Sequence, residues 1–398
     1  MTEDAINREV NIKMMKNSLK IFLMIVVACF LAVTGCANGK SQSGGAESSV
    51  EYITVTDLEG RSVTLNYPAE RVILMESSRT AEFSAICGDG FAEKIVGWDN
   101  DFKNNAGDGY QTYLKKYPRL ADIPDVGSLD DNTFSIEKVI SLRPDVVIMH
   151  SWQFMWCGDA IKDALAKLEQ AGIPVLFVDF YMEPMTNSAR SMLLLGEIMG
   201  EKQRAQEIAD FYNDKVDTVY SRLAGINGTK PDVYIECGYN GPGNYGITEG
   251  NVGWGSIVIK AGGNNIAEPL LGEKSEPISP EYLVDNSPDI IILTGRHWST
   301  PGSLRMGYVT SPDETKSTME PFVRRPGWNT IDAVKNNRVY GIYHGYCFSV
   351  YNFAALEALA KWFYPEKFKD LDPDATLKEF HQRFMPIGYT GTFLYHYN

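Results

Sequence analysis

Short apolar runs alternate with helical segments along most of the chain, and this alternation predicts the fold. Runs such as Arg71–Met75, Asp145–Met149 and Val175–Asp179 are apolar almost throughout, which is typical of strands buried on both faces of a parallel sheet. Helical segments follow them, for example at Ala81–Ile86 and Asp159–Ala171. The pattern therefore predicts an α/β fold with doubly wound parallel sheets.

The same pattern starts again in the second half of the chain. Two long helical segments, Thr186–Met199 and Glu201–Leu223, come first, and Gly200 separates them. The second would span about 35 Å at 1.5 Å per residue, enough to pass from one lobe to another. New strands are then predicted at Asp232–Glu236, Asp289–Thr294 and Arg338–Ile342. We therefore expect two α/β lobes with the long helix as the bridge between them.

One stretch of sequence occurs twice, once in each predicted lobe. SIEKVISLRPDVVIM at Ser135–Met149 and SPEYLVDNSPDIIIL at Ser279–Leu293 align without a gap. Each predicts a short helix with a serine N-cap and a glutamate in its first turn, followed by a buried strand. The repeat thus marks equivalent positions in the two lobes.

The N-terminus predicts export and lipid attachment. Basic residues precede an uncharged apolar stretch, Ile21–Thr34, which is too short to span a bilayer and is typical of an export signal. It ends in Val33–Cys36 (VTGC), which resembles the lipobox of bacterial lipoproteins and makes Cys36 the lipidated residue. The alternative is a plain signal peptide with a chance cysteine. The next residues are rich in Gly and Ser, as in a flexible tether.

These features predict a linear organisation of the chain. It comprises a lipoprotein signal at 1–36, a tether at 37–50, an N-terminal lobe at 51–184, bridging helices at 185–225 and a C-terminal lobe at 226–398. The formal charge is −14, which argues against nucleic acid as a partner, since phosphates are bound by Lys and Arg. No phosphate-binding loop, nucleophile elbow or zinc-protease motif is present, so no enzyme is predicted. A metal chelatase remains the enzymatic alternative, and a receptor ectodomain would need a transmembrane segment.

The cysteines after the signal are widely spaced and make a zinc knuckle an unfavoured interpretation. Export permits disulfides, but buried free thiols are the favoured interpretation for these residues, which are Cys87, Cys157, Cys237 and Cys347.

Aromatic, histidine and arginine residues gather just after the predicted strands. Ligands of open α/β sheets bind beyond the carboxyl ends of the strands, and aromatic rings and arginine suit a large planar or anionic metal complex. The alternative for each aromatic residue is ordinary packing. The predicted ligand-binding residues are Arg79, Trp98, His150, Trp152, Tyr181, Tyr239, Tyr245, Arg296, His297, Trp298, Tyr343, His344 and Tyr346.

Three histidines at these positions, His150, His297 and His344, are candidates for direct metal ligation. Hydrogen bonding to a ligand oxygen is the favoured interpretation, so no metal site is assigned. We expect no permanently bound cofactor, and a ligand that is a chelated metal.

Ordered motifs over Glu51–Phe384 carry a family resemblance. After the lipobox come VTDLEGRSVTL, RVIL, KIVGWD, FSIEKVISLRPDVVI, GGNNIAE, ISPEYLV, SPDIIIL, PGWNTIDAVKNNRVY and WFYPEKF. The chain resembles the substrate-binding lipoproteins of ABC importers for ferric siderophores, haem and cobalamin. The resemblance implies two Rossmann-like lobes with parallel sheets, joined by a long rigid α-helix, with the ligand cleft between the lobes. It also implies that Glu137 and Glu281 dock onto arginines of the permease. The first-turn position of these glutamates is the alternative explanation for them.

The expected function follows from this resemblance. The protein would capture an iron complex, a ferric siderophore, outside the cytoplasmic membrane and deliver it to an ABC permease dimer with its ATPase. Cobalamin or another corrinoid, haem, and free zinc or manganese are the alternatives. We expect a lipid-anchored monomer at the cell surface or in the periplasm, and the aromatic tail after Phe384 is expected to act as a lid or as a packing strap.

Overall fold

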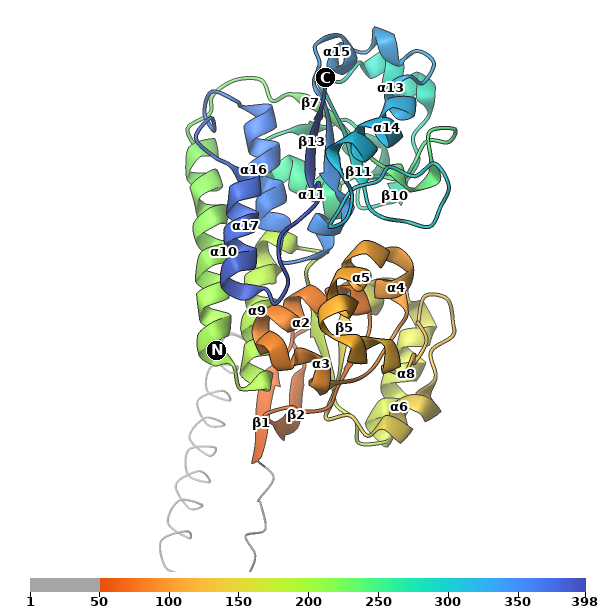
Figure 1. The fold of residues 1–398 in the computed structure, drawn as a ribbon, viewed down its shortest axis with the longest axis vertical. Coiled ribbons are helices and arrows are strands. Elements are labelled where there is room, and N and C mark those ends of the chain that lie inside the picture. Colours follow the sequence, from red (N-terminus) through yellow and green to blue (C-terminus); the bar gives the residue numbers. More distant parts are fainter. Residues whose placement is uncertain (1–50) are drawn as a thin grey trace, which may run out of the picture. The chain divides into compact units, whose positions relative to one another are not determined.

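The computed structural model describes residues 51–398, whose main strands form two separate sheets, one in each half of Figure 1. The predicted signal, tether and Cys36 lie outside the described residues. We call the part that holds β1–β6 the N-terminal lobe and the part that holds β7–β13 the C-terminal lobe. The predicted α/β fold with parallel sheets is confirmed.

The N-terminal sheet is entirely parallel, in the order β4-β3-β5-β6. Its strands are β3 (Val72–Leu74), β4 (Ile95–Trp98), β5 (Val146–His150) and β6 (Val175–Val178). Along β5, Val146 and Ile148 belong to one hydrophobic cluster, whereas Val147 and Met149 belong to another. Both faces of the sheet are therefore covered, which explains why the sequence shows continuous apolar runs rather than alternation.

A hairpin precedes this sheet and helices surround it. The hairpin consists of antiparallel β1 (Glu51–Thr56) and β2 (Ser62–Tyr67). The helices are α2 (Thr80–Cys87), α3 (Phe91–Lys94), α4 (Asp101–Asn105), α5 (Gly107–Lys116), α6 (Ile136–Leu142), α7 (Ser151–Trp156) and α8 (Gly158–Gln170).

The C-terminal sheet has the order β13-β12-β11-β7-β9, and only β13 is antiparallel to its neighbour. Its strands are β7 (Asp232–Cys237), β9 (Asn264–Asn265), β11 (Ile290–Gly295), β12 (Val339–Tyr343) and β13 (Leu394–Tyr397), and β8 (Thr248–Glu249) pairs with β10 (Ser275–Glu276) beside it. The helices are α11 (Gly253–Lys260), α12 (Glu268–Leu271), α13 (Pro280–Asn286), α14 (Pro312–Val323), α15 (Asp332–Lys335), α16 (Asn352–Phe363) and α17 (Pro373–Phe384).

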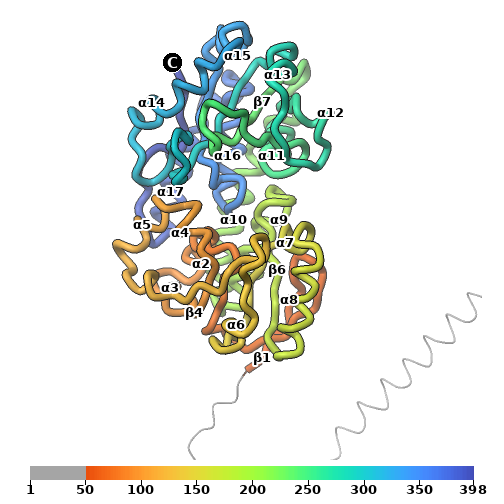
Figure 2. Tube along the Cα trace, turned by 90° about the vertical axis from the view of Figure 1, so that its right-hand side faces the viewer, coloured from red at the N-terminus to blue at the C-terminus, as the bar shows by residue number. Residues whose placement is uncertain are grey.

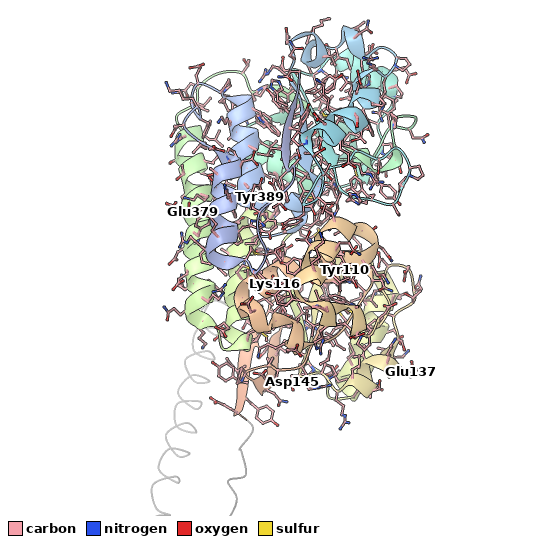
Figure 3. The ribbon with its side chains drawn as sticks, viewed as in Figure 1. Tyr110, Lys116, Glu137, Asp145, Glu379 and Tyr389 are labelled. Atoms are coloured by element: carbon pink, nitrogen blue, oxygen red, sulfur yellow. The ribbon has the colours of Figure 1, made fainter. Side chains whose placement is uncertain are left out.

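The aromatic tail acts as a packing strap. Its strand β13 pairs with β12, and Phe393 just before it is buried against Tyr308 and Tyr343. Tyr389 also packs against His381 of α17 (Figure 3). The tail therefore completes the edge of the C-terminal sheet.

Two long helices, α9 (Pro184–Met199) and α10 (Lys202–Leu223), run between the lobes. Near its start, α10 holds the N-terminal lobe through Arg204, which donates a hydrogen bond to the carbonyl of Ala85 in α2. Near its end, Arg222 pairs with Asp370 of the C-terminal lobe at 2.7 Å. Figures 1 and 2 show α10 beside both lobes. Gly200, with φ of 76°, ends α9 and allows the chain to turn back into α10.

The repeated serines are N-caps, as predicted. Ser135 Oγ accepts the backbone N–H of Lys138 at the start of α6, and Ser279 Oγ accepts that of Tyr282 at the start of α13. Both helices then end in a left-handed residue, Arg143 or Ser287, before a proline.

The repeated aspartates explain a further part of the duplicated sequence. Asp145 accepts the backbone N–H groups of Glu70 and Arg71 at 2.9 Å, just before β3. Asp289 accepts the backbone N–H of Asp232, the first residue of β7, at 2.9 Å. Each aspartate thus holds the start of its own strand against the start of the neighbouring strand, in both lobes alike (Asp145 is labelled in Figure 3).

Two further findings concern the described residues. Within residues 51–398, no helix is long and apolar enough to cross a membrane. Cys87, Cys157, Cys237 and Cys347 are free thiols, as the sequence favoured.

The close approach of α9 and α10 yields a first prediction. A Cβ atom added at Gly196 would lie 2.1 Å from the Cβ of Ala205. We expect Gly196→Val to separate the two helices and to lower the free energy of unfolding by about 1–3 kcal/mol, as overpacked sites do. Urea denaturation measures the change. Gly243→Val is the control, because nothing lies within 4 Å of its added Cβ, and equal losses in both variants would contradict the assigned role of Gly196.

Candidate functional site

The carboxyl ends of both sheets face one cleft between the lobes. Hydrogen bonds between residues of opposite lobes cross it. Tyr181, after β6, donates to Glu249 at 2.8 Å. The backbone N–H of Tyr308 donates to Asp108 of α5 at 2.7 Å, and that of Val350 donates to Glu82 of α2 at 2.8 Å. The site is therefore built from segments far apart in the sequence that follow the strands of both lobes.

A buried network lies on the N-terminal side of the cleft. Glu76, just after β3, pairs with Arg79 and accepts the indole N–H of Trp152 at 2.6 Å. Its φ of 71° is in the left-handed region, which costs a residue other than glycine roughly 1 kcal/mol or more. Burial raises the pKa of Glu76 to about 8, against the opposing charge of Arg79. The carboxyl group therefore compensates Arg79 incompletely near neutral pH.

Two arginines from opposite lobes line one narrow space in the cleft. Arg79 and Arg296 are only 6% and 8% exposed, and the Nε of each has no hydrogen-bond partner among the described residues. Tyr343 and Tyr351 line the same space. A buried donor without a partner is costly, so this arginine pair is suited to a ligand that brings anionic or acceptor oxygens.

An aromatic pocket of ≈ 250 Å³ opens beside the arginine pair. Tyr181 and Phe348, from opposite lobes, stack there with their ring centroids 4.6 Å apart and an interplanar angle of 8°. Burial raises the pKa of Glu249, which accepts from Tyr181 and from the backbone of Trp254, to about 7. We use the name aromatic pocket for the space lined by Trp156, Tyr181, Ile247, Glu249, Trp254 and Phe348 together with the strand ends behind them.

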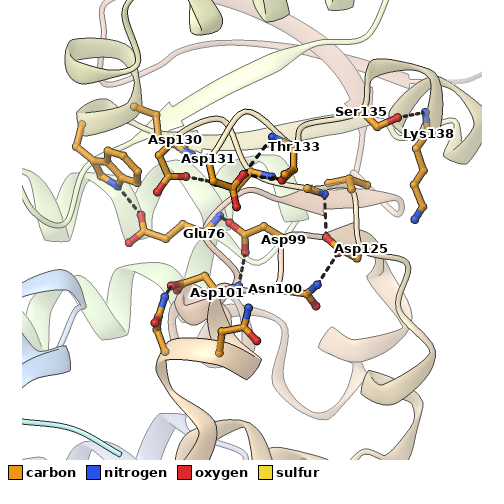
Figure 4. A pocket seen from close by; sticks show the side chains of 17 residues that line it. Glu76, Asp99, Asn100, Asp101, Asp125, Asp130, Asp131, Thr133, Ser135 and Lys138 are labelled. Atoms are coloured by element: carbon orange, nitrogen blue, oxygen red, sulfur yellow. Dashed lines mark hydrogen bonds between the residues drawn. The ribbon is translucent and has the colours of Figure 1, made fainter. Parts of the chain in front are cut away.

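A second, acidic pocket of ≈ 520 Å³ lies within the N-terminal lobe. Figure 4 shows its carboxylates arriving from several loops. Asp99 accepts the backbone N–H groups of Glu76 at 2.6 Å and Ser77 at 2.7 Å. Burial, together with the charge of Asp101, raises the pKa of Asp99 to about 7. The pocket shares Glu76 and Trp152 with the buried network, and its other acidic residues are Asp101, Asp125, Asp130 and Asp131.

The cleft brings many of the predicted ligand-binding residues together. Tyr181 and His344 line the aromatic pocket, while Arg79, Arg296 and Tyr343 line the arginine space. His150 and Trp152 join the Glu76 network, with His150 Nδ1 3.7 Å from the Glu76 carboxylate. Trp298 lies 5.1 Å from His344 between ring centroids and also packs on Tyr239, and His297, the next residue along, is half-buried.

Three predicted residues lie instead in aromatic packing away from the pockets of the cleft. Trp98 packs edge-to-face on Phe102 and Tyr110. Tyr346 is fully buried and stacks on Phe393. The third, Tyr245, accepts the indole N–H of Trp328 at 2.9 Å. A ligand contact for any of the predicted residues stays a prediction.

Sequence reasoning missed Glu249 and Phe348 as members of the site. Glu249 lies in the two-residue strand β8, which has no apolar run to reveal it. Phe348 ends a 3₁₀ turn at His344–Phe348 after β12. The cluster of aromatic residues after β12 was a signal for this turn, but only the fold places its last ring against Tyr181.

Two of the candidate histidines, His150 and His344, are buried and neutral at physiological pH. Burial, with the charges of Arg296 and Arg79, lowers the pKa of His344 to about 3, and its Nδ1 lies 2.8 Å from Thr294 Oγ1. Burial also lowers the pKa of His150 well below its ordinary value. Within residues 51–398, no three His, Cys, Asp or Glu side chains gather as a metal site. Direct ligation by His150, His297 or His344 stays a prediction.

The two repeated glutamates are exposed and lie in the first turns of α6 and α13. Figure 3 shows Glu137 at the periphery of the N-terminal lobe. Figure 1 places α6 and α13 on the side of the molecule away from α10. The helices that carry the two glutamates thus lie on the same side in both lobes.

Comparisons with known proteins agree with this architecture. A family model described as periplasmic binding protein matches residues 90–344. The crystal structure of a TroA-like periplasmic binding protein FepB from Veillonella parvula is 37% identical with a TM-score of 0.81, covering 87% of this chain and 100% of that chain. The uncharacterized ABC transporter substrate-binding lipoprotein YvrC of Bacillus subtilis is 24% identical, over 82% of this chain and 90% of that protein. The iron(3+)-hydroxamate-binding protein YxeB of the same organism is 20% identical, over 82% and 89%.

The raised pKa of Glu249 predicts a pH dependence of stability. In the unfolded chain this group ionises near 4.5, whereas in the folded protein it keeps its proton to about pH 7. Because the folded state binds the extra proton between these values, the free energy of unfolding falls as the pH rises across this window. We expect wild type to lose roughly 1–3 kcal/mol more than Glu249→Gln between about pH 5 and about pH 8, as measured by urea denaturation.

The exposed Glu169 provides the control for this measurement. Glu169→Gln should keep the pH dependence of wild type. Parallel curves for wild type and Glu249→Gln would show that Glu249 does not carry the effect.

Proposed function

Because this chain belongs to the periplasmic binding protein family, whose model matches residues 90–344, we propose that it captures an iron complex, a ferric siderophore, for import. The chain is an ABC importer substrate-binding protein that acts outside the cytoplasm with a membrane permease and an ATPase. Its family and fold are those of solute-binding proteins, which are not enzymes. The part that we propose is the identity of the ligand.

The arginine pair carries the proposal of an iron complex. Arg79 and Arg296 meet from opposite lobes with Nε donors that no described residue satisfies. Hydroxamate or catecholate oxygens around a ferric ion are anionic acceptors, and guanidinium groups pair well with such oxygens. The metal in this proposal arrives already chelated, so the protein holds the outer oxygens of the complex. The similarity to the hydroxamate-binding relative supports the same class of ligand.

The proposal includes two attachments outside the cleft. Cys36 would be lipidated and would hold the protein at the outer face of the cytoplasmic membrane, through the Gly- and Ser-rich tether at 37–50. Glu137 and Glu281 would dock onto basic residues of the permease, one from each lobe. A pseudo-two-fold pair of carboxylates suits a two-fold permease dimer, and charge complementarity of this kind sets orientation and specificity.

Tryptophan quenching against a panel tests the ligand class. The panel holds a ferric trihydroxamate, a ferric triscatecholate, haem, cobalamin, and zinc or manganese salts. We expect one ferric chelate to quench at submicromolar concentration and the bare metals to remain silent. Quenching by cobalamin or haem alone would overturn the iron proposal. A response only to bare metal would overturn it too, and would indicate that His150, His297 and His344 bind the metal directly.

The arginine pair has its own test with the ferric chelate that binds. Arg79→Lys and Arg296→Lys keep the charge but lose the planar fork of donors, so each should weaken binding roughly ten-fold or more. Arg119→Lys is the control, since Arg119 pairs with Glu93 on the surface of the N-terminal lobe. Unchanged affinity in both cleft variants would show that Arg79 and Arg296 do not bind the ferric chelate.

Charge reversal tests docking. We expect Glu137→Lys with Glu281→Lys to abolish uptake into cells, because both carboxylates would repel the basic surface of the permease, and to leave ligand affinity unchanged. Glu169→Lys with Glu366→Lys is the matched control, with the same change of net charge at one exposed position in each lobe. Normal uptake by the first double variant, or a loss of its ligand affinity, would contradict the docking role.

A further inference from the structure

We propose that the aromatic pocket is a subsite separate from the arginine pair, and that it binds a flat, uncharged group of one or two rings with a single hydroxyl or carbonyl. This inference rests on the proposed function, because the ring would be part of the same ligand whose anionic oxygens contact the arginine pair. The pocket would then select among chelates that present the same iron centre but carry different appended groups.

The size and walls of the pocket define the group. An apolar cavity of about 150 Å³ suffices for benzene, so ≈ 250 Å³ leaves space for one or two rings. The walls are the aromatic rings of Trp156, Tyr181, Trp254 and Phe348 with the aliphatic side chain of Ile235 behind them. Aromatic walls of this kind favour offset-stacked or edge-to-face contacts with a flat ligand.

The charge of the lining excludes an ionic group from the pocket. Among the described residues that line it there is no lysine or arginine, whereas Glu249 contributes a carboxyl group. An anionic group would therefore meet the carboxyl group without a counter-ion. The arginine space beside the pocket offers the better environment for that end of the ligand.

Two residues that line the pocket carry buried polar atoms without a hydrogen-bond partner among the described residues. Thr248 Oγ1 and Trp254 Nε1 belong to lining residues that are 1% and 2% exposed, and neither atom has a hydrogen-bond partner among the described residues. They flank Glu249, whose carboxyl group accepts from Tyr181 and from the backbone of Trp254. Unsatisfied buried polar atoms are costly, and one hydroxyl or carbonyl on the ring would meet them with a small shift of the side chains.

Phe348 separates the pocket from the arginine pair. Tyr181 stacks on its ring at 4.6 Å, and the guanidinium of Arg79 lies 5.3 Å from the same ring centroid. The ring therefore lies between the pocket and Arg79, and the proposed ligand would pass beside it to reach both spaces. At the mouth, Trp156 and Ile247, from opposite lobes, are 50% and 45% exposed. Exposed apolar side chains at the rim of a pocket mark an apolar ligand path.

The experiment uses 2-naphthol as a neutral two-ring probe with one hydroxyl, and measures its binding to the purified protein by calorimetry. Ile247→Glu places a carboxylate at the mouth. Val309→Glu makes the same change at a residue that is 49% exposed and does not line the pocket. We expect wild type and Val309→Glu to bind 2-naphthol alike, and Ile247→Glu to bind it roughly ten-fold more weakly.

Several outcomes would overturn the inference. If Ile247→Glu bound 2-naphthol with the same affinity as wild type, the aromatic pocket would not be the binding site. Absence of binding to wild type would have the same meaning. Naphthalene-2-sulfonate should bind more weakly than 2-naphthol, and equal affinity for the two probes would contradict the uncharged class.

The same measurements separate this inference from the proposed function. Arg296→Lys should weaken the ferric chelate and leave 2-naphthol binding unchanged. Binding of 2-naphthol without binding of any ferric chelate would support the ring subsite and overturn the iron proposal. Binding of a ferric chelate with no effect of Ile247→Glu on 2-naphthol would support the iron proposal and overturn the ring subsite.

Discussion

The packing of α10 against both lobes is the constraint on which the rest of the structure depends. Gly196 of α9 leaves room for Ala205 of α10. Near the start of α10, Arg204 donates to a carbonyl of each lobe, at Ala85 and at Phe384, and near its end Arg222 pairs with Asp370 of the C-terminal lobe. Because a helix resists bending far more than a pair of extended strands does, the two sheets are held with their carboxyl ends facing one cleft. The meeting of Arg79 with Arg296, and of Tyr181 with Phe348, follows from this placement.

The cleft concentrates groups that are costly to bury. Glu76 combines a left-handed backbone with a carboxyl group whose pKa burial raises, and two guanidinium groups lack partners for their Nε atoms. Elsewhere in the described protein a comparable buried charge is fully paired. Arg325, for example, makes two hydrogen bonds to the Glu236 carboxylate at 2.7 and 2.9 Å. The unmet donors of the cleft are groups that the proposed ligand would satisfy, whereas the Arg325–Glu236 pair is already complete within the fold.

Local patterns in the sequence predicted the parts of the fold that local forces determine. The apolar runs identified the strands, Gly200 the break between the long helices, and Ser135 and Ser279 the starts of two helices. The parts that depend on distant contacts escaped prediction. Strand β13 exists because its residues pair with β12, and its own sequence carries no separate signal.

The sequence predicted the location of the site, but it did not predict which of the candidate residues line it. Position after a strand correctly pointed to the cleft for Arg79, Arg296 and Tyr181. Residue type and position could not distinguish these from Trp98 or Tyr346, whose rings pack into the core. Glu249 was hidden because its contact with Tyr181 joins two lobes, and no periodicity in the sequence reports such a contact.

The acidic pocket makes the distribution of charge around the cleft uneven. Its carboxylates lie on the N-terminal side, next to Glu76 and Trp152, so their field repels an anion that diffuses toward the arginine pair along that flank. The aromatic pocket, between Trp156 and Ile247, has one carboxyl group in its lining, that of Glu249, against several in the acidic pocket. An anionic solute would therefore meet less opposing charge on the side of the aromatic pocket, and this difference would bias its path of approach before any contact forms.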